Sequence, residues 1–381
     1  MNGGINMGKN ERLLIYPYNM EFTPVLRHRS LLTGYEISCL VSPNGWGFTG
    51  KDAGIADRGP DIGILVSSDF EKSLDLCDTV MIVESHLHFD FEKYIFNKIK
   101  LAIKLKKNII CSLKLNEDAI KEISSMCNCE GVYFKYYDEN QNVLPYGIVV
   151  ENENIEEIDT PIILTIGMAE KTSKFEIQLA LREKIIKLGY KISQIGTRSY
   201  CDMMGFHSFP SFMYGNEISG VNKVLMFNRF IKKIEKTEEP DIIIIGVPGA
   251  IMPFDSKFTN KFGLLAFEIS QAITPDVVIA SLLYEDYKLE GFDMYSNLFK
   301  YKFGFEIDFF NIANMQFDWS KAKDQHVRSY TSLDYRFIDE KKMSYSNNKI
   351  PVLNILNKND SDHMIDQTIE KLSEYGDVQI I

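Results

Sequence analysis

The chain has 381 residues, of which 45% are hydrophobic and 25% are charged, so it is long enough for two domains with substantial cores. No apolar run approaches the roughly 20 residues that cross a bilayer, and the Gly- and Asn-rich start lacks the apolar region of a signal peptide, so a cytoplasmic protein without membrane contact is expected. The formal net charge of −11 argues against general nucleic-acid binding, although loop amides and a helix N-terminus can still hold a small anion.

The N-terminal part alternates strand and helix patterns, which predicts a mostly parallel sheet covered on both faces. The expected strands are 12–17, 36–41, 62–66, 79–83 and 108–113, and the expected helices are a segment through Leu26 and Leu32, then 70–77, 91–106 and 117–127. The first strand ends in Tyr16-Pro17-Tyr18-Asn19 and lacks a Gly-x-Gly-x-x-Gly turn, so the domain is Rossmann-like without the dinucleotide fingerprint. The segment Gly45–Gly54, with Lys51 and Asp52, is a candidate ligand loop.

A polar, acidic segment at 138–160 is the expected linker to a second α/β series. In that series the expected strands are 161–166, 190–195, 241–245, 276–282 and 351–356, the expected helices are 174–188, 221–236, 261–272 and 363–375, and 377–381 is a candidate terminal strand. The sequence therefore predicts two doubly wound, mostly parallel-sheet α/β domains, Rossmann-like at 11–137 and P-loop NTPase-like at 161–381.

The segment from Ile162 to Glu176 has an apolar strand, a tight turn and a helix start led by lysine, which is the layout of a phosphate-binding P-loop. A P-loop needs glycine where backbone N–H groups turn inward and a lysine on the phosphates. The residues expected to bind phosphate are Gly167, Thr172, Ser173 and Lys174. The alternative is an ordinary strand-to-helix turn whose lysine is solvated.

Three residues depart from the P-loop pattern. Ser173 stands where the second glycine is expected, Phe175 where Ser or Thr holds magnesium, and Ile245 where the neighbouring strand usually ends in an acidic residue. Loss of these metal ligands removes charge neutralisation on which phosphoryl transfer depends. Binding of ATP or another nucleotide is therefore expected before its hydrolysis, with no metal site assigned and with Thr172, Ser173 or Glu176 as substitutes if magnesium binds.

Further ligand-binding candidates follow two other strands, because α/β proteins bind ligands at the carboxyl edge of the sheet. The strand 241–245 continues into Gly246-Val247-Pro248-Gly249. The strand 190–195 continues into a loop that contains Arg198, several aromatic residues and His207. Arg198 is expected to clamp a carboxylate or phosphate, with His207, Gly246 and Gly249 nearby and Lys261-Phe262-Gly263 on the same rim. The alternative is a loop that only packs its aromatic side chains.

No metal centre is expected. His86-Leu87-His88 lacks supporting ligands and is interpreted as a turn in which Asp90 caps a helix, and Cys127-Asn128-Cys129 lacks a second cysteine pair. The cysteines have no framework spacing, which indicates reduced thiols. They are Cys39, Cys77, Cys111, Cys127, Cys129 and Cys201.

Two resemblances follow from the motifs. The C-terminal half resembles the dethiobiotin-synthetase-like P-loop NTPases. It shares with them a loop of Gly167, five intervening residues and Ser173-Lys174, and a strand that ends in Gly-x-x-Gly. Several further segments are spread over nearly the whole chain: 14–18, 45–47, 50–54, 174–182, 205–210 and 259–263. Through them the chain resembles a clostridial family of peptide maturation system proteins, from gene clusters that make ribosomally synthesised, radical-SAM-modified peptides. This resemblance implies a biological setting without supplying a reaction.

Three functions remain open. The first is an accessory protein of peptide maturation that binds a nucleotide or other phosphate through the altered P-loop, with a precursor peptide or maturation enzymes as partners. The second is a non-catalytic scaffold that binds peptide or enzyme through the aromatic loop after Gly196. The third is an ATP-dependent ligase or kinase acting on a peptide, with magnesium on Glu176 or Asp202. The sequence does not indicate the oligomeric state.

Overall fold

The computed structural model describes residues 10–85, 90–137, 153–325 and 328–376. The chain divides into an N-terminal unit, Met1–Glu139 with Ser199–Gly205, and a C-terminal unit, Asn140–Arg198 with Phe206–Ile381. Each unit contains its own parallel sheet flanked by helices, so the predicted fold class is confirmed. A single domain boundary in the sequence does not describe this division, because the short segment Ser199–Gly205 lies between elements of the C-terminal unit in sequence but belongs to the N-terminal unit.

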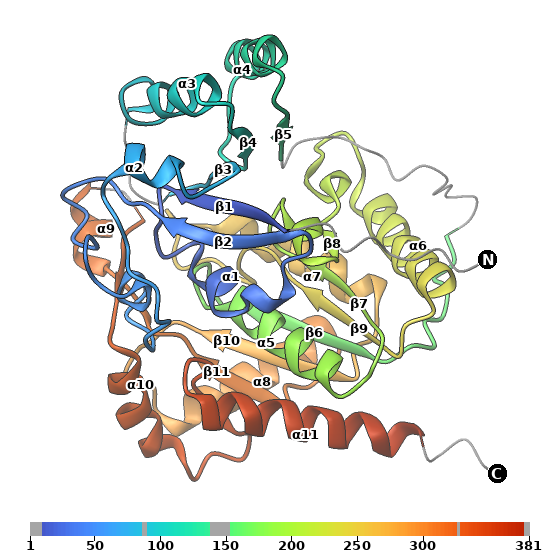
Figure 1. Ribbon diagram of the computed structural model, residues 1–381. Coiled ribbons are helices and arrows are strands. Elements are labelled where there is room, and N and C mark those ends of the chain that lie inside the picture. Colours follow the sequence, from blue (N-terminus) through green and yellow to red (C-terminus); the bar gives the residue numbers. More distant parts are fainter. Residues whose placement is uncertain (1–9, 86–89, 138–152, 326–327, 377–381) are drawn as a thin grey trace. The chain divides into compact units, whose positions relative to one another are not determined.

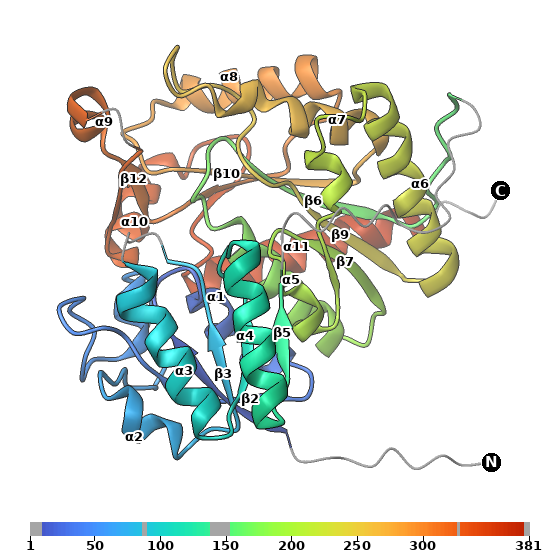
Figure 2. The ribbon, with the colours of Figure 1, turned by 90° about the horizontal axis from the view of Figure 1, so that it is seen from above.

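The N-terminal unit has a parallel sheet of strand order β2-β1-β3-β4-β5. Its strands are β1 (Glu11–Tyr16), β2 (Tyr35–Leu40), β3 (Thr79–Ile82), β4 (Asn108–Cys111) and β5 (Phe134–Tyr136). Its helices are α1 (Thr23–Arg27), α2 (Phe70–Leu74), α3 (Asn97–Lys104, after a π-helical turn at Glu92–Phe96) and α4 (Glu117–Glu130). Side chains of α2, α3 and α4, among them Leu74, Ile99 and Ile123, share a core with strand residues such as Val80. Figure 2 shows α3 and α4 lying along the strands of this sheet.

One predicted strand of this unit, 62–66, is wrong. The segment forms only isolated bridges, and its backbone amides turn toward a carboxylate: Asp52 accepts hydrogen bonds from the amides of Gly54, Ile62 and Gly63 at 2.7–2.8 Å. Val66 is buried and Leu65 is 68% exposed, but the segment gains no ladder of strand pairing beyond these isolated bridges. Asp52 therefore organises its own loop and is not placed as a ligand residue.

The C-terminal unit has a parallel sheet of strand order β14-β11-β10-β6-β9-β7-β8, whose strands β6 to β11 are labelled in Figure 1. A separate antiparallel ribbon is formed by β12 and β13. The strands are β6 (Ile162–Gly167), β7 (Ile192–Gly196), β8 (His207–Ser208), β9 (Ile242–Gly246), β10 (Val277–Leu282), β11 (Phe309–Ile312), β12 (Met315–Phe317), β13 (Tyr330–Ser332) and β14 (Val352–Leu353). The helices are α5 (Lys174–Lys187), α6 (Gly220–Glu238), α7 (Leu264–Ala272), α8 (Leu289–Phe303), α9 (Trp319–Gln325), α10 (Tyr335–Lys342) and α11 (Lys358–Gly376).

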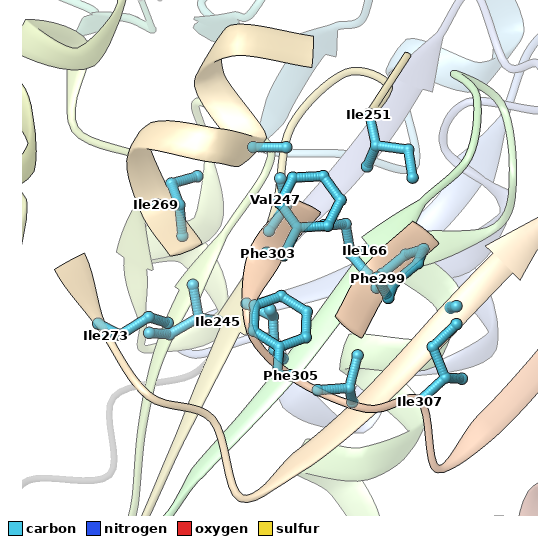
Figure 3. Packing of buried hydrophobic residues seen from close by; sticks show 14 of the residues in the cluster. Ile166, Ile245, Val247, Ile251, Ile269, Ile273, Phe299, Phe303, Phe305 and Ile307 are labelled. Atoms are coloured by element: carbon cyan, nitrogen blue, oxygen red, sulfur yellow. The ribbon is translucent and has the colours of Figure 1, made fainter. Parts of the chain in front are cut away.

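Two apolar cores cover the two faces of this sheet. On one face, α6, α7 and α8 pack on the strands, and Ile269, Phe299 and Phe303 lie close to Ile166 and Ile245 (Figure 3). On the other face, α5 and α11 pack on the strands, with Ile177 and Ile365 among the buried side chains. Strands buried on both faces are nearly continuous in apolar residues, as in Ile242–Ile245, which explains why the sequence predicts them well.

The predicted helix at 261–272 begins three residues later, at Leu264. Asn260, Lys261, Phe262 and Gly263 all have positive φ, between 48° and 69°, so the chain makes a left-handed turn before α7. A Cβ at Gly263 would overlap the carbonyl of Ile251, which requires glycine at this contact. None of the described helices combines the length and the apolarity that a membrane-spanning helix requires.

Candidate functional site

The predicted P-loop segment forms a strand, a tight loop and a helix. β6 ends at Gly167 and α5 begins at Lys174, and β6 lies between β9 and β10 in the parallel sheet. A Cβ at Gly167 would meet Lys174 Nζ and Thr172 Oγ1, so only glycine allows both side chains to fold back over the end of the strand. The loop therefore has the strand–loop–helix form of a phosphate cradle at the carboxyl edge of the sheet.

Lys174 is buried inside this loop, with 8% of its side chain exposed. Its Nζ donates hydrogen bonds to the carbonyl oxygens of Ala169 (3.0 Å) and Gly249 (2.8 Å), and it lies 3.4 Å from Thr172 Oγ1. Burial lowers the pKa of Lys174 to about 8, an effect opposed by Glu170 and reinforced by the charge of Arg198. The lysine is thus a mostly protonated cation at neutral pH, turned inward onto loop carbonyls.

The end of the loop has backbone donors that could bind an anion. No hydrogen bond in the described part of the chain uses the amides of Thr172, Ser173 or Lys174 as donors. These amides precede or begin α5, whose positive dipole end favours negative charge. Ser173 has φ 58°, a left-handed conformation that glycine adopts more readily, so the serine reproduces the turn of a P-loop glycine at a conformational cost.

Two polar residues on the neighbouring strands hold the loop from behind. Ser281 of β10 donates its hydroxyl proton to the carbonyl oxygen of Thr172, and Asn311 of β11 donates to Ser281 Oγ at 2.7 Å. The side-chain oxygen of Asn311 in turn accepts from the amide of Ile355 at 2.8 Å. These residues are completely or almost completely buried, and the sequence analysis missed both, because a lone polar residue in an apolar strand carries no motif.

Phe175 holds the motif position where a P-loop usually has a metal-binding hydroxyl, and its ring contacts Arg198. Phe175 is 5% exposed, and the guanidinium carbon of Arg198 lies 5.7 Å from the centre of its ring. This distance is within the range of a cation–π contact. Ile245, in place of the acidic strand-end residue, is fully buried in the apolar core (Figure 3). The described residues contain no group of His, Cys, Asp or Glu side chains suited to a metal ion.

The structure brings most of the predicted ligand residues together. Gly249 binds Lys174 through its carbonyl, and Gly246 pairs with Thr165 of β6 at the end of β9. A Cβ at Gly246 would overlap the side-chain amide of Gln178 of α5, which explains the need for glycine at this strand end. His207 is not brought to the loop: its Nε2 lies 2.5 Å from Glu238 Oε1 at the end of α6.

The loop after Gly196 was predicted to offer aromatic side chains to a ligand, but most of them are buried, and Tyr214, at 39%, is the exposed one. Tyr200, Phe206, Phe209 and Phe212 are each 2–9% exposed. The alternative, in which the loop packs its aromatics, agrees with these values. Asp202, a candidate magnesium ligand, forms an ion pair with Lys135 at 2.8 Å in the N-terminal unit.

The other sequence candidates have structural roles or cannot be placed. His86-Leu87-His88 lies outside the described residues, and Asp90 accepts a hydrogen bond from the amide of Lys93 at 3.1 Å, as a capping residue does. The cysteines are free thiols, and Cys129 is the exposed one.

A groove of about 1010 Å³ lies at the opposite edge of the C-terminal sheet, near the first residues of β6 and β10. Carboxylates and aromatic rings share its lining, which includes Glu156, Glu157, Asp159 and Asp276 with Phe267 and Tyr301. Tyr301 is 83% exposed and Phe267 is 42% exposed. The groove is therefore separate from the phosphate cradle and has an acidic, partly apolar surface.

The fold is similar to that of a DUF1611 family protein from Anabaena variabilis, with a TM-score of 0.61 and 12% sequence identity over 95% of this chain and 100% of that chain. At this identity the likeness shows the fold alone. An apo GTPase from Pyrococcus abyssi gives a TM-score of 0.27 at 14% identity, over 55% of this chain and 97% of that one, which is too low for a structural argument. No protein-family model matches the sequence, and a search of curated proteins gives no match.

Proposed function

We propose that the protein binds a nucleotide or another phosphate-bearing ligand in the cradle between β6 and α5. The observation that carries the proposal is the buried ammonium of Lys174, which faces loop carbonyls beside amides that have no acceptor among the described residues. A phosphate would accept from both the lysine and the amides, and the ammonium would then face a charged acceptor in place of neutral carbonyls.

Titration calorimetry of the full chain with ATP and with ADP tests this proposal. Lys174→Met is expected to weaken binding at least about tenfold, because a hydrogen bond to a charged group contributes about 1.5–3 kcal/mol. Lys187→Met is the matched control: this lysine lies on the same helix and pairs with Glu183 on the surface at 2.9 Å. Binding of neither nucleotide at millimolar concentration, or equal losses in both variants, would contradict the proposal.

The same titration has an expected pH dependence. The bound anion favours the protonated lysine and raises its pKa above the value of about 8 in the free protein. Between about pH 7, where the terminal phosphate is already ionised, and pH 8 the affinity should therefore change little. It should fall as the pH rises further, while Lys174→Met should show no such fall.

The biological setting that we propose is peptide maturation, with the protein as an accessory factor for a precursor peptide or a maturation enzyme. The support for this setting is the sequence resemblance carried by segments such as Gly205–Pro210. Release of phosphate from ATP that a precursor peptide stimulates would favour a ligase or kinase over an accessory role.

A second candidate function is a scaffold that binds a basic, partly apolar peptide in the acidic groove. Its support is the acidic lining: four carboxylates and one lysine, Lys302, line the groove. Two of these carboxylates, Glu156 and Asp159, pair with Lys236 and Lys232 at 3.2 and 2.9 Å, so Glu157 is the one that we expect to attract a basic peptide. The exposed ring of Tyr301 offers apolar contact at the rim.

Fluorescence anisotropy with a labelled peptide of Lys and Leu, compared with one of Glu and Leu, tests the scaffold function. Tyr301→Ala and Glu157→Lys should each weaken binding of the basic peptide several-fold, and added salt should weaken it further. Met294→Ala is the control, because Met294 is 62% exposed on α8 and does not line the groove. Equal binding of both peptides would argue against this candidate.

A further inference from the structure

The residues around the cradle do not fit the divalent metal that accompanies nucleotide phosphates in ordinary P-loops. A P-loop holds magnesium through a Ser or Thr hydroxyl and an acidic residue at a strand end. Here Phe175 and Ile245 take those places, and neither side chain has an oxygen. The carboxylate of Glu170 is engaged as well, with Oε2 2.9 Å from Arg328 Nη1. Glu176, in the first turn of α5, is the remaining carboxylate, and it is 5% exposed. With both usual metal ligands replaced, another source of positive charge would favour a polyphosphate in this cradle.

The protein has a second cation beside the cradle lysine. Arg198 follows directly after β7, and its guanidinium lies over the ring of Phe175, the residue next to Lys174 on α5. The charge of Arg198 acts on Lys174 strongly enough to contribute to the lowering of its pKa. Two like charges held near each other in a low-dielectric site repel, and an anion between them relieves that repulsion.

Resting on the proposed function, we propose that Arg198, held by the ring of Phe175, takes the place of magnesium, so that the cradle binds the phosphates of a nucleotide without a divalent metal. A guanidinium has a planar fork of N–H donors that matches two phosphate oxygens, which an ammonium does not, so Arg198 could exchange its present contacts for phosphate oxygens. Phe175 would then have a function: in the position of a metal ligand, its ring would hold the guanidinium of Arg198 through a cation–π contact.

Titration of the full chain with ADP, once in EDTA and once in millimolar magnesium, tests the inference. The affinity in EDTA is expected to be at least as high as in magnesium, because magnesium only competes for the free nucleotide. Arg198→Ala should weaken binding in EDTA at least about tenfold, the loss expected for a charged donor, and Arg198→Lys should recover part of it. Arg336→Ala is the matched control, since Arg336 also lies over an aromatic ring, 5.9 Å from the centre of Tyr335, on the exposed surface of α10.

Phe175→Ser provides an independent arm, because it restores the hydroxyl of an ordinary P-loop and removes the platform. This variant should bind ADP more tightly in magnesium than in EDTA, the reverse of the natural chain. If the natural chain binds ADP in magnesium and loses it in EDTA, the inference is wrong while the proposed function stands; a further loss in Glu176→Gln would then assign the metal to Glu176. If ADP binds under neither condition, the proposed function fails and the inference fails with it.

Discussion

At the scale of single residues, the cradle depends on backbone conformations that its side chains do not favour. Ser173 has φ 58° and Lys171 has φ 60°, whereas the P-loop pattern has glycine at the first of these positions. A non-glycine residue in this left-handed region is destabilised by about 1–2 kcal/mol. Ser173, which departs from the P-loop motif, is therefore also a site of backbone strain in the loop that we assign to ligand binding.

Ser173→Gly should raise the free energy of unfolding by about 0.5–1 kcal/mol, because relief of the left-handed strain exceeds the added freedom of glycine in the unfolded chain. Urea unfolding measures the effect. Ser296→Gly is the control with the opposite sign: Ser296 lies within α8, where glycine costs about 0.5–1 kcal/mol. A destabilised Ser173→Gly variant would mean that the serine side chain makes a contribution larger than the strain.

The sequence reveals residues of the cradle that belong to a motif and hides those that support it. Gly167 and Lys174 have fixed spacing on one continuous segment, and the structure joins them as the motif implies. Ser281 and Arg198 reach the same loop from other strands. Their positions depend on the order of strands in the sheet, which periodicity along one segment cannot supply.

At the scale of elements, prediction succeeded where burial leaves a continuous apolar run and failed where a polar residue or a short edge interrupts it. β9 is four isoleucines followed by glycine and was predicted nearly to the residue. β11 was missed because it is short and contains Asn311, whose side chain is satisfied only by contacts from β10 and from the segment after β14. β5 pairs with a single strand, β4, and has no fully buried residue.

The helix α5 shows a different limit. From Lys174 through Arg182 every residue is buried, so the helix has no solvated stripe to set its amphipathic pattern. The apolar positions Phe175, Leu179, Ile185 and Ile186 predict an amphipathic helix, and this pattern is wrong. The predicted end is right, because Gly189 has φ 94° and follows the helix. Polar side chains of α5 such as Gln178 and Glu176 are therefore buried as well. In a helix with only one buried face, such polar residues would lie on the solvent-exposed face.

At the scale of the whole molecule, each unit has a sheet of its own, and the chain passes between the two units more than once. Ser199–Gly205 belongs to the N-terminal unit, where the ring of Tyr200 lies 6.2 Å from that of Phe22 and 6.4 Å from that of Tyr137. Sequence patterns assign a segment to the domain of its neighbours. Only contacts between residues that are far apart in the sequence show that Ser199–Gly205 belongs to the N-terminal unit. This segment begins directly after Arg198.

The accessibility of the thiols tests this arrangement. Cys201, inside the returning segment, is fully buried, as are Cys77 and Cys111, and burial raises the pKa of Cys77 to about 11 and of Cys111 to about 12. Since the thiolate is the reactive form, titration of the native protein with a disulfide reagent should modify Cys129 rapidly and the others slowly. Cys129→Ser should abolish the rapid phase, while Cys201→Ser should leave it unchanged and lower by one the number of thiols that react in denaturant. A rapid phase that Cys201→Ser reduces would show that Ser199–Gly205 is not packed as the structure describes.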